Sequence, residues 1–125
     1  MKNEHSILVV DDEIHMCEVL KRLLKKAGYY VFTASDGKKA LNITRERKPD
    51  VILLDLMMPG MNGREVCQIV RKMSPDTKVI YLTAKVESDL VKLKEIRNEA
   101  DTFIAKPATS NKILSSIENV LHKVV

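Results

Sequence analysis

Short apolar runs alternate along this chain with longer segments in which apolar residues recur at helical spacing. The first is Ile7–Val10, and a second, Val51–Leu54, has the same unbroken apolar character. Continuous runs of this kind are typical of parallel strands that are covered on both faces. Further strands are predicted over Tyr29–Ala34, Val79–Leu82 and Phe103–Ala105. The alternation therefore restricts the chain to the α/β class, because parallel strands need crossover connections.

The segments between these strands carry helix signals. Glu13–Ala27 has apolar residues three or four positions apart, and Gly28 after it suits the left-handed position that follows a helix. Further helices are predicted from Ser35 or Asp36 to Arg47, over Glu65–Met73, over Ser88–Asn98, and from a cap at Ser110 to Lys123. The chain thus reads as five strand–helix units joined by right-handed crossovers, with helices on both faces of the sheet.

The length and composition are those of one ordinary domain. We expect residues 1–125 to form a single domain with no effector domain in this chain. A hydrophobic content of 45% suffices for a packed core, and no apolar run is long enough for a signal peptide or a membrane span. Cys17 and Cys67 have neither disulfide-framework nor metal-site spacing, which fits a reducing compartment. These features predict a cytoplasmic protein without membrane contact.

The formal net charge of +4 raises the possibility of nucleic-acid binding. Lysines and arginines concentrate at Lys21–Lys26 and Lys38–Lys48. However, the chain has no helix-turn-helix pattern, zinc-finger spacing or aromatic–basic RNA motif. We therefore interpret these clusters as solvated helix faces and expect no direct nucleic-acid binding.

Polar side chains follow the predicted strands at their carboxyl ends. Asp11 and Asp12 follow the first strand, Asp55 the third, Thr83 the fourth and Lys106 the fifth. Ligands of open α/β sheets bind beyond this edge, where the strand order reverses. Three carboxylates in one crevice repel one another, so they predict a cation, and oxygen ligands suit Mg²⁺. A lysine and a hydroxyl beside them suit a phosphoryl group transferred onto a carboxylate.

Each of these residues alone has a simpler interpretation. An aspartate after a strand is often a helix cap, a threonine there is often a turn residue, and a single lysine is usually on the surface. The prediction depends on four strand ends agreeing at once, which chance does not readily produce.

The motifs in chain order resemble those of response-regulator receiver domains, over Ile7 to Leu121. They are Val9–Glu13, Pro49–Pro59, Asn62-Gly63, Leu82–Ala84 and Phe103–Pro107. The resemblance implies a flavodoxin-like (βα)5 fold, a doubly wound five-stranded parallel sheet with strand order 2-1-3-4-5. The sequence departs from the family pattern at Asn98–Asp101, where a Gly-Ala-Asp string is usual.

The resemblance also implies the chemistry of the site. Asp55 would accept a phosphoryl group, Thr83 would hydrogen-bond the phosphoryl oxygens, and Lys106 would pair with the phosphate. Mg²⁺ would be the cofactor. Its implied ligands are Asp11, Asp12, Asp55 and the backbone carbonyl of Met57.

The resemblance further implies a switch and its partners. Thr83 and Phe103 would be the switch residues, and the fourth helix, fifth strand and fifth helix would form the output surface. The Lys106–Pro107 bond would be cis, as X–Pro bonds permit. A sensor histidine kinase or phosphotransfer protein would supply the phosphoryl group, and a downstream effector protein or a fused output domain would read the state.

Three alternatives compete with the switch. A phosphatase of the haloacid dehalogenase type needs a second aspartate two residues after its nucleophile, as general acid and base, and that position is Met57. A flavin-binding protein is disfavoured because Asp11–Glu13 would repel the FMN phosphate. A module without chemistry would require a broken acceptor site, and the key residues are present. We therefore predict a switch that catalyses only its own phosphorylation and dephosphorylation, and not an enzyme in the usual sense.

Overall fold

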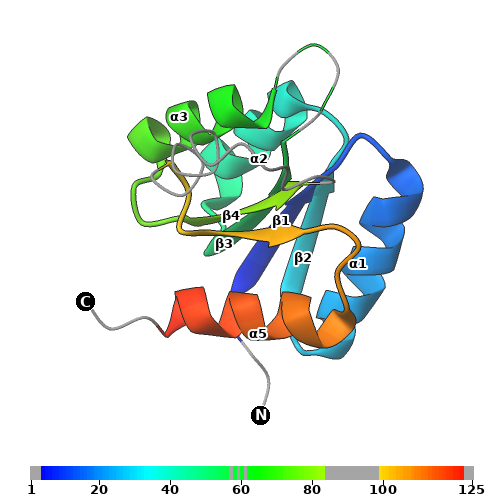
Figure 1. Cartoon of the computed structure of the whole chain (residues 1–125). Helices are drawn as coiled ribbons and strands as arrows, with labels where there is room; N and C mark the ends of the chain where they lie inside the picture. The colour runs from blue at the N-terminus through cyan, green and yellow to red at the C-terminus, as the bar shows by residue number, and fades with distance from the viewer. Residues whose placement is uncertain (1–3, 57, 59, 61, 84–98, 123–125) are drawn as a thin grey trace.

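A five-stranded parallel sheet forms the centre of the protein (Figure 1). The computed structural model describes residues 4–56, 58, 60, 62–83 and 99–122. The order of the strands across the sheet is β2-β1-β3-β4-β5, and every neighbouring pair is parallel. This confirms the predicted doubly wound topology. The strands are β1 (Ser6–Val10), β2 (Tyr30–Ala34), β3 (Val51–Asp55), β4 (Lys78–Thr83) and β5 (Thr102–Ala105).

Helices cover both faces of the sheet, as predicted. Helices α1 (Ile14–Lys26) and α5 (Ser110–Leu121) lie on one face, and α2 (Gly37–Arg47) and α3 (Gly63–Met73) lie on the other (Figure 1). The helix predicted over Ser88–Asn98 is outside the described residues. Among the helices that are described, none combines the length and apolar character needed to cross a membrane.

The core consists of two apolar layers, one on each side of the sheet. Ile7 and Val9 of β1 belong to the layer under α1 and α5, whereas Leu8 and Val10 belong to the layer under α2 and α3. Successive side chains of a strand point to opposite faces, and helices cover both faces here. All four residues are therefore fully buried. Burial on both faces is the physical reason for the unbroken apolar run.

The helix starts refine three predicted boundaries. The sequence offered Ser35 or Asp36 as the cap of α2. Asp36 is the cap, because its side chain accepts a hydrogen bond from the N–H of Lys39. The predicted cap of α5 at Ser110 is wrong by one residue, because the extended Thr109 accepts the capping hydrogen bond and Ser110 is already helical. Helix α3 starts two residues before the predicted Glu65, because Asn62 supplies the cap.

Candidate functional site

The carboxyl ends of the central strands bring the predicted site residues to one edge of the sheet. Asp11 comes directly after β1, Asp55 is the last residue of β3, and Lys106 follows β5. Thr83 ends β4 and pairs with Ala105 of the neighbouring strand. From β1, the chain first adds β2 on one side and then β3 on the other, so the strand order reverses between β1 and β3. This is the position at which open α/β sheets bind ligands.

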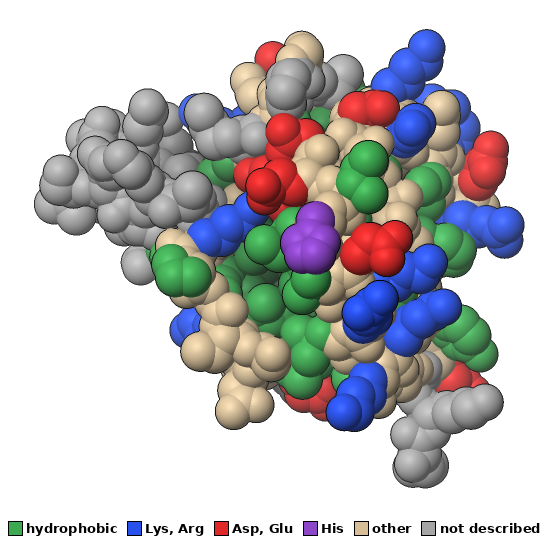
Figure 2. Space-filling view, turned by 90° about the vertical axis from the view of Figure 1, so that its right-hand side faces the viewer, with side chains coloured by type: hydrophobic (Ala, Val, Ile, Leu, Met, Phe, Trp, Pro, Cys, Tyr) green, Lys and Arg blue, Asp and Glu red, His purple; other side chains and the backbone are tan. Residues whose placement is uncertain are grey.

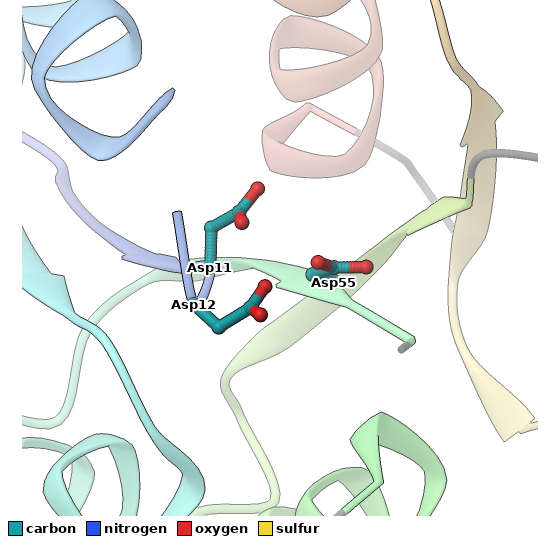
Figure 3. Close-up of side chains that lie close together, drawn as sticks. All are labelled: Asp11, Asp12 and Asp55. Atoms are coloured by element: carbon teal, nitrogen blue, oxygen red, sulfur yellow. The ribbon is translucent and has the colours of Figure 1, made fainter. Parts of the chain in front are cut away.

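Three carboxylates meet at this edge. Asp11, Asp12 and Asp55 each offer one oxygen, and these oxygens all lie within 4.8 Å of one another (Figure 3). Asp11 is fully buried and Asp55 is only 7% exposed, whereas Asp12 is exposed. Negative charges this close, two of them removed from water, require compensation by positive charge.

Lys106 supplies part of that compensation. Its Nζ lies 3.1 Å from Oδ2 of Asp11 and 3.8 Å from Oδ2 of Asp55. With Asp12 included, these four residues carry a formal charge of −2, which a divalent cation would neutralise. The Lys106–Pro107 peptide bond is cis, as predicted.

Backbone contacts fix the Asp11 carboxylate and the chain that carries Asp55. The N–H of Glu13 donates to Oδ1 of Asp11 at 3.0 Å. On the other side, the N–H of Gly63 donates to the carbonyl of Leu56 at 3.0 Å, and a Cβ on Gly63 would lie 2.6 Å from the carbonyl oxygen of Asp55. Helix α3 therefore begins directly against the backbone of Asp55. The sequence marked Gly63 only as part of a loop motif, so this packing was missed.

Two predicted site residues, Met57 and Thr83, fall wholly or partly outside the described atoms. The Met57 backbone carbonyl, a predicted Mg²⁺ ligand, is outside the described residues. Of Thr83, the backbone is described and the side chain is not. Phe103 is half-buried on β5 and packs against the core layer under α2 and α3. The structure thus brings the two predicted switch residues onto neighbouring strands.

Cys17 lies directly beneath the acidic cluster. Its thiol donates to the carbonyl oxygen of Asp11 at 3.3 Å. Burial raises the pKa of this thiol, and the negative charge of Asp11 raises it further, so the sulfur stays protonated at neutral pH. The thiol is therefore a neutral packing group beneath the site, as its apolar helix position indicated.

A polar network joins α3 to the chain just before β5. Glu99 accepts hydrogen bonds from the guanidinium of Arg64 and, at 3.0 Å, from the hydroxyl of Tyr81. The Arg64 guanidinium holds the pKa of Glu99 below its usual value, and burial raises the pKa of Tyr81. Arg71 pairs with Asp101 at 3.0 Å. Glu99 stands where the sequence departs from the family pattern, and the sequence analysis did not predict this network.

Comparisons with known proteins agree with this fold and this arrangement of residues. A family model described as the response regulator receiver domain matches residues 7–118. The structure is similar to that of the chemotaxis protein CheY4 of Vibrio cholerae, with 32% identity, a TM-score of 0.87, and coverage of 95% of this chain and 100% of that chain. A response regulator receiver domain protein from Clostridium thermocellum has 30% identity, a TM-score of 0.86 and 95% coverage of both chains. One from Methanospirillum hungatei has 27% identity and a TM-score of 0.86, covering 95% of this chain and 94% of that chain.

Proposed function

Because this chain belongs to the response regulator receiver domain family, we propose that it is a phosphorylation switch whose acceptor is Asp55. The observation that carries the proposal is the meeting of three carboxylates and one lysine at the carboxyl edge of the sheet. Asp55 is the member of this group at the end of a central strand, with Asp11 and Asp12 on one side and the Lys106 ammonium 3.8 Å away. Receiver domains act as signalling switches in two-component systems, in agreement with this assignment.

The proposed reaction is a phosphoryl transfer onto a carboxylate. An Asp55 carboxylate oxygen attacks the phosphorus of a donor phosphohistidine and forms an acyl phosphate. The donor P–N bond breaks, and its electron pair stays on the imidazole nitrogen. The Lys106 ammonium lies beside the position of the incoming phosphoryl oxygens, since its Nζ is within ion-pair distance of Asp55. Positioning and neutralisation of charge supply most of the catalysis in such transfers.

The acidic cluster fits a hard divalent cation. Asp11, Asp12 and Asp55 offer oxygen ligands close enough to share one ion, and we propose the Met57 carbonyl as a further ligand. When bound, Mg²⁺ would neutralise the charge of the phosphoryl oxygens. The formal charge of −2 on the three aspartates and Lys106 explains why a divalent ion suits the site.

A phosphatase remains the alternative with similar chemistry, and the sequence disfavours it. Turnover of an aspartyl phosphate by that route needs a general acid and base two residues after the nucleophile. That residue is Met57, which has no proton to transfer. The proposed product is therefore a phosphorylated protein that persists as a signal.

An apolar surface beside the site could contact a partner protein. A cavity of about 390 Å³ between α1 and the start of α5 is lined mainly by apolar side chains, with Lys106 at its edge. Figure 2, which faces α1, shows hydrophobic side chains gathered in the middle of this side of the protein. We propose that the sensor histidine kinase or phosphotransfer protein contacts this surface while its phosphohistidine approaches Asp55. A downstream effector protein or a fused output domain would then read the phosphorylated state.

Phosphorylation by a small donor tests this function directly. We expect acetyl phosphate with Mg²⁺ to add one phosphoryl group to the protein, as measured by intact mass. Asp55→Asn should remove the added mass, because an amide oxygen is a poor nucleophile, and chelation of Mg²⁺ should suppress it. Asp76→Asn, at an exposed aspartate in a turn, is the matched control and should label like the parent. Equal labelling of Asp55→Asn and the parent would refute the assignment of the acceptor.

A further inference from the structure

The β2 edge of the sheet presents backbone groups that point away from the protein. The N–H of Tyr30 donates to the carbonyl of His5, and the carbonyl of Ala34 accepts from the N–H of Asp11, so these residues turn their backbone groups toward β1. Because backbone direction alternates along a parallel strand, the N–H and C=O groups of Val31 and Thr33 point outward. Within the described part of the chain, these groups have no backbone partner.

The β2 strand lacks the residue types that usually protect an edge from pairing. Its sequence is Tyr-Val-Phe-Thr-Ala, without a lysine, a proline or any charge. Tyr30 is 61% exposed, and the next three residues are partly exposed. Edge strands are normally blocked by charged residues, proline or bulges, so an uncharged edge is open to a further strand.

Positive charge surrounds this edge. Nine of the twenty-one Lys and Arg residues lie between Lys21 and Lys48, where only Asp36 and Glu46 are acidic. This stretch carries a formal charge of +7 and the rest of the chain −3. None of the nine forms an ion pair with a carboxylate of the described residues, whereas Arg64, Arg71 and Lys106 all do.

These cations flank β2 from both faces of the sheet. Helices α1 and α2, which carry eight of the nine, both pack on β2, one on each face. Figure 2 shows Lys and Arg side chains gathered along one side of the α1 face. A strand that joined the edge would therefore have positive charge beside both rows of its side chains.

A polar cavity lies at the carboxyl end of this edge. It has a volume of about 250 Å³ and is lined by residues of α1, α2 and β2. Lys21 of α1 and Lys39 of α2 contribute ammonium groups, and Thr33 and Ser35 contribute hydroxyls, with Glu18 also on the wall. Two cations and two hydroxyl donors suit one carboxylate side chain.

We propose that the β2 edge binds an acidic, extended segment of a partner protein, which adds to the sheet as a sixth strand. Backbone hydrogen bonds to Val31 and Thr33 would supply affinity, and a carboxylate in the cavity between Lys21 and Lys39 would supply specificity. An extended peptide can pair with both the outward N–H and the outward C=O groups, whereas an occupant held by charge alone would leave them bonded to water. A second copy of this chain is disfavoured, because pairing two such edges would bring two strongly positive faces together.

An NMR titration with a designed peptide tests the proposal. The probe is an acetylated and amidated octapeptide of alternating glutamate and threonine, added to isotope-labelled protein. We expect chemical-shift changes in β2, slower amide exchange at Val31 and Thr33, and weaker binding as salt is added. The same peptide with glutamine in place of glutamate should bind about tenfold more weakly, because its side chains carry no charge.

Two kinds of variant separate charge from strand pairing. The double variant Lys21→Glu and Lys39→Glu should weaken peptide binding by at least about tenfold, whereas Lys72→Glu with Lys112→Glu, at exposed sites elsewhere, should not. Val31→Pro removes one outward N–H, a change that edge strands tolerate, and should also weaken binding. If Val31→Pro does not fold, the charge-reversal pair and the exchange of the Thr33 amide in the parent still decide the question.

Several results would overturn the proposal. Peptide binding that is unchanged by Lys21→Glu with Lys39→Glu would contradict the assigned charges. Equal affinity for single-stranded DNA or for anionic phospholipid vesicles, without protection of the Val31 and Thr33 amides, would show binding by charge alone. Dimerisation of the protein through β2 would show that a second copy is the occupant. Acetyl phosphate labelling of Asp55 is measured in parallel and does not depend on the outcome.

Discussion

Gly63 packs so closely on Asp55 that a single methyl group would disturb the site. An added Cβ would lie 2.6 Å from the Asp55 carbonyl oxygen and 2.8 Å from the Cα of Leu56. Both are backbone atoms, so the start of α3 or the end of β3 must move. We predict that Gly63→Ala lowers the free energy of unfolding by about 1–3 kcal/mol, as overpacking does, and slows labelling of Asp55 by acetyl phosphate.

Urea denaturation and the time course of intact mass measure the two effects of Gly63→Ala. Gly60→Ala is a suitable comparison, because Gly60 has a φ of +85° but no atom of the described residues lies within 4 Å of an added Cβ. That variant should lose stability through backbone strain while its labelling rate changes less. Labelling of Gly63→Ala at the parent rate would show that Asp55 does not depend on this packing.

Glu99 makes a pH-dependent contribution to stability through Arg64 and Tyr81. Its pKa in the folded protein is below the usual 4.5, first because of the hydrogen bonds from Arg64. A lowered folded-state pKa means that the stabilisation is fully present above the unfolded-state pKa and is lost as pH falls through the folded-state pKa. We predict that Glu99→Gln lowers the free energy of unfolding by about 1–3 kcal/mol at pH 7, because it removes charge-assisted hydrogen bonds.

The pH profile distinguishes this contribution from a general packing effect. The difference in unfolding free energy between the parent and Glu99→Gln should stay constant from pH 7 to about pH 5 and then shrink as Glu99 becomes protonated. Denaturant unfolding of both proteins between pH 7 and pH 3 measures it. The control Glu46→Gln, at an exposed residue of α2, should differ little from the parent. A difference that grows toward low pH would contradict a lowered pKa for Glu99.

At the scale of secondary-structure elements, two adjacent hydroxyl residues stand at the start of α5, and only Thr109 caps the helix. Thr109 has extended backbone angles and accepts a hydrogen bond from the N–H of Lys112 at 3.1 Å. We predict that Thr109→Ala lowers the free energy of unfolding by about 1 kcal/mol, whereas Ser110→Ala changes it by less than about 0.5 kcal/mol. Urea denaturation measures the free energy of unfolding of both variants. A larger loss in Ser110→Ala than in Thr109→Ala would identify Ser110 as the cap instead.

At the scale of the whole molecule, the proposed switch requires that a phosphoryl group on Asp55 change a distant surface. A phosphoryl group brings about −1.5 to −2 charges to the end of β3. Thr83 ends the adjacent β4, and β5, which carries Phe103, pairs with β4. Phe103 is half-buried, so it has room to change its packing. We predict that Thr83→Ala accepts beryllofluoride, a phosphoryl mimic, but transmits the change to Phe103 poorly.

NMR spectra with and without beryllofluoride measure this transmission. In the parent protein, we expect shifts around Phe103 and in the predicted helix Ser88–Asn98, and in Thr83→Ala much smaller ones. Thr77→Ala serves as the matched control, because it removes the same groups just before β4, at the opposite end of that strand. Shifts as large in Thr83→Ala as in the parent would show that the coupling runs by another route.

The sequence by itself determined the fold class and the membership of the site. Unbroken apolar runs identify buried parallel strands through local burial alone, without knowledge of their partners. Because parallel strands share one direction, residues after each strand reach the same edge of the sheet, so Asp11, Asp55 and Lys106 could be grouped before their distances were known. The cap of α5 was missed because Thr109 and Ser110 offer the same hydroxyl, and backbone geometry decides between them.

Only the tertiary structure decided contacts between segments that are far apart in the chain. Lys106 and Asp11 are 95 residues apart, and Arg64 and Glu99 are 35 apart. No local pattern encodes which cation meets which carboxylate over such separations, because that depends on strand register and on how the helices pack. The close approach of Gly63 to Asp55 and the cavity beside β2 have the same origin. Periodicity is a property of one segment, whereas a distance between side chains is a property of the packed molecule.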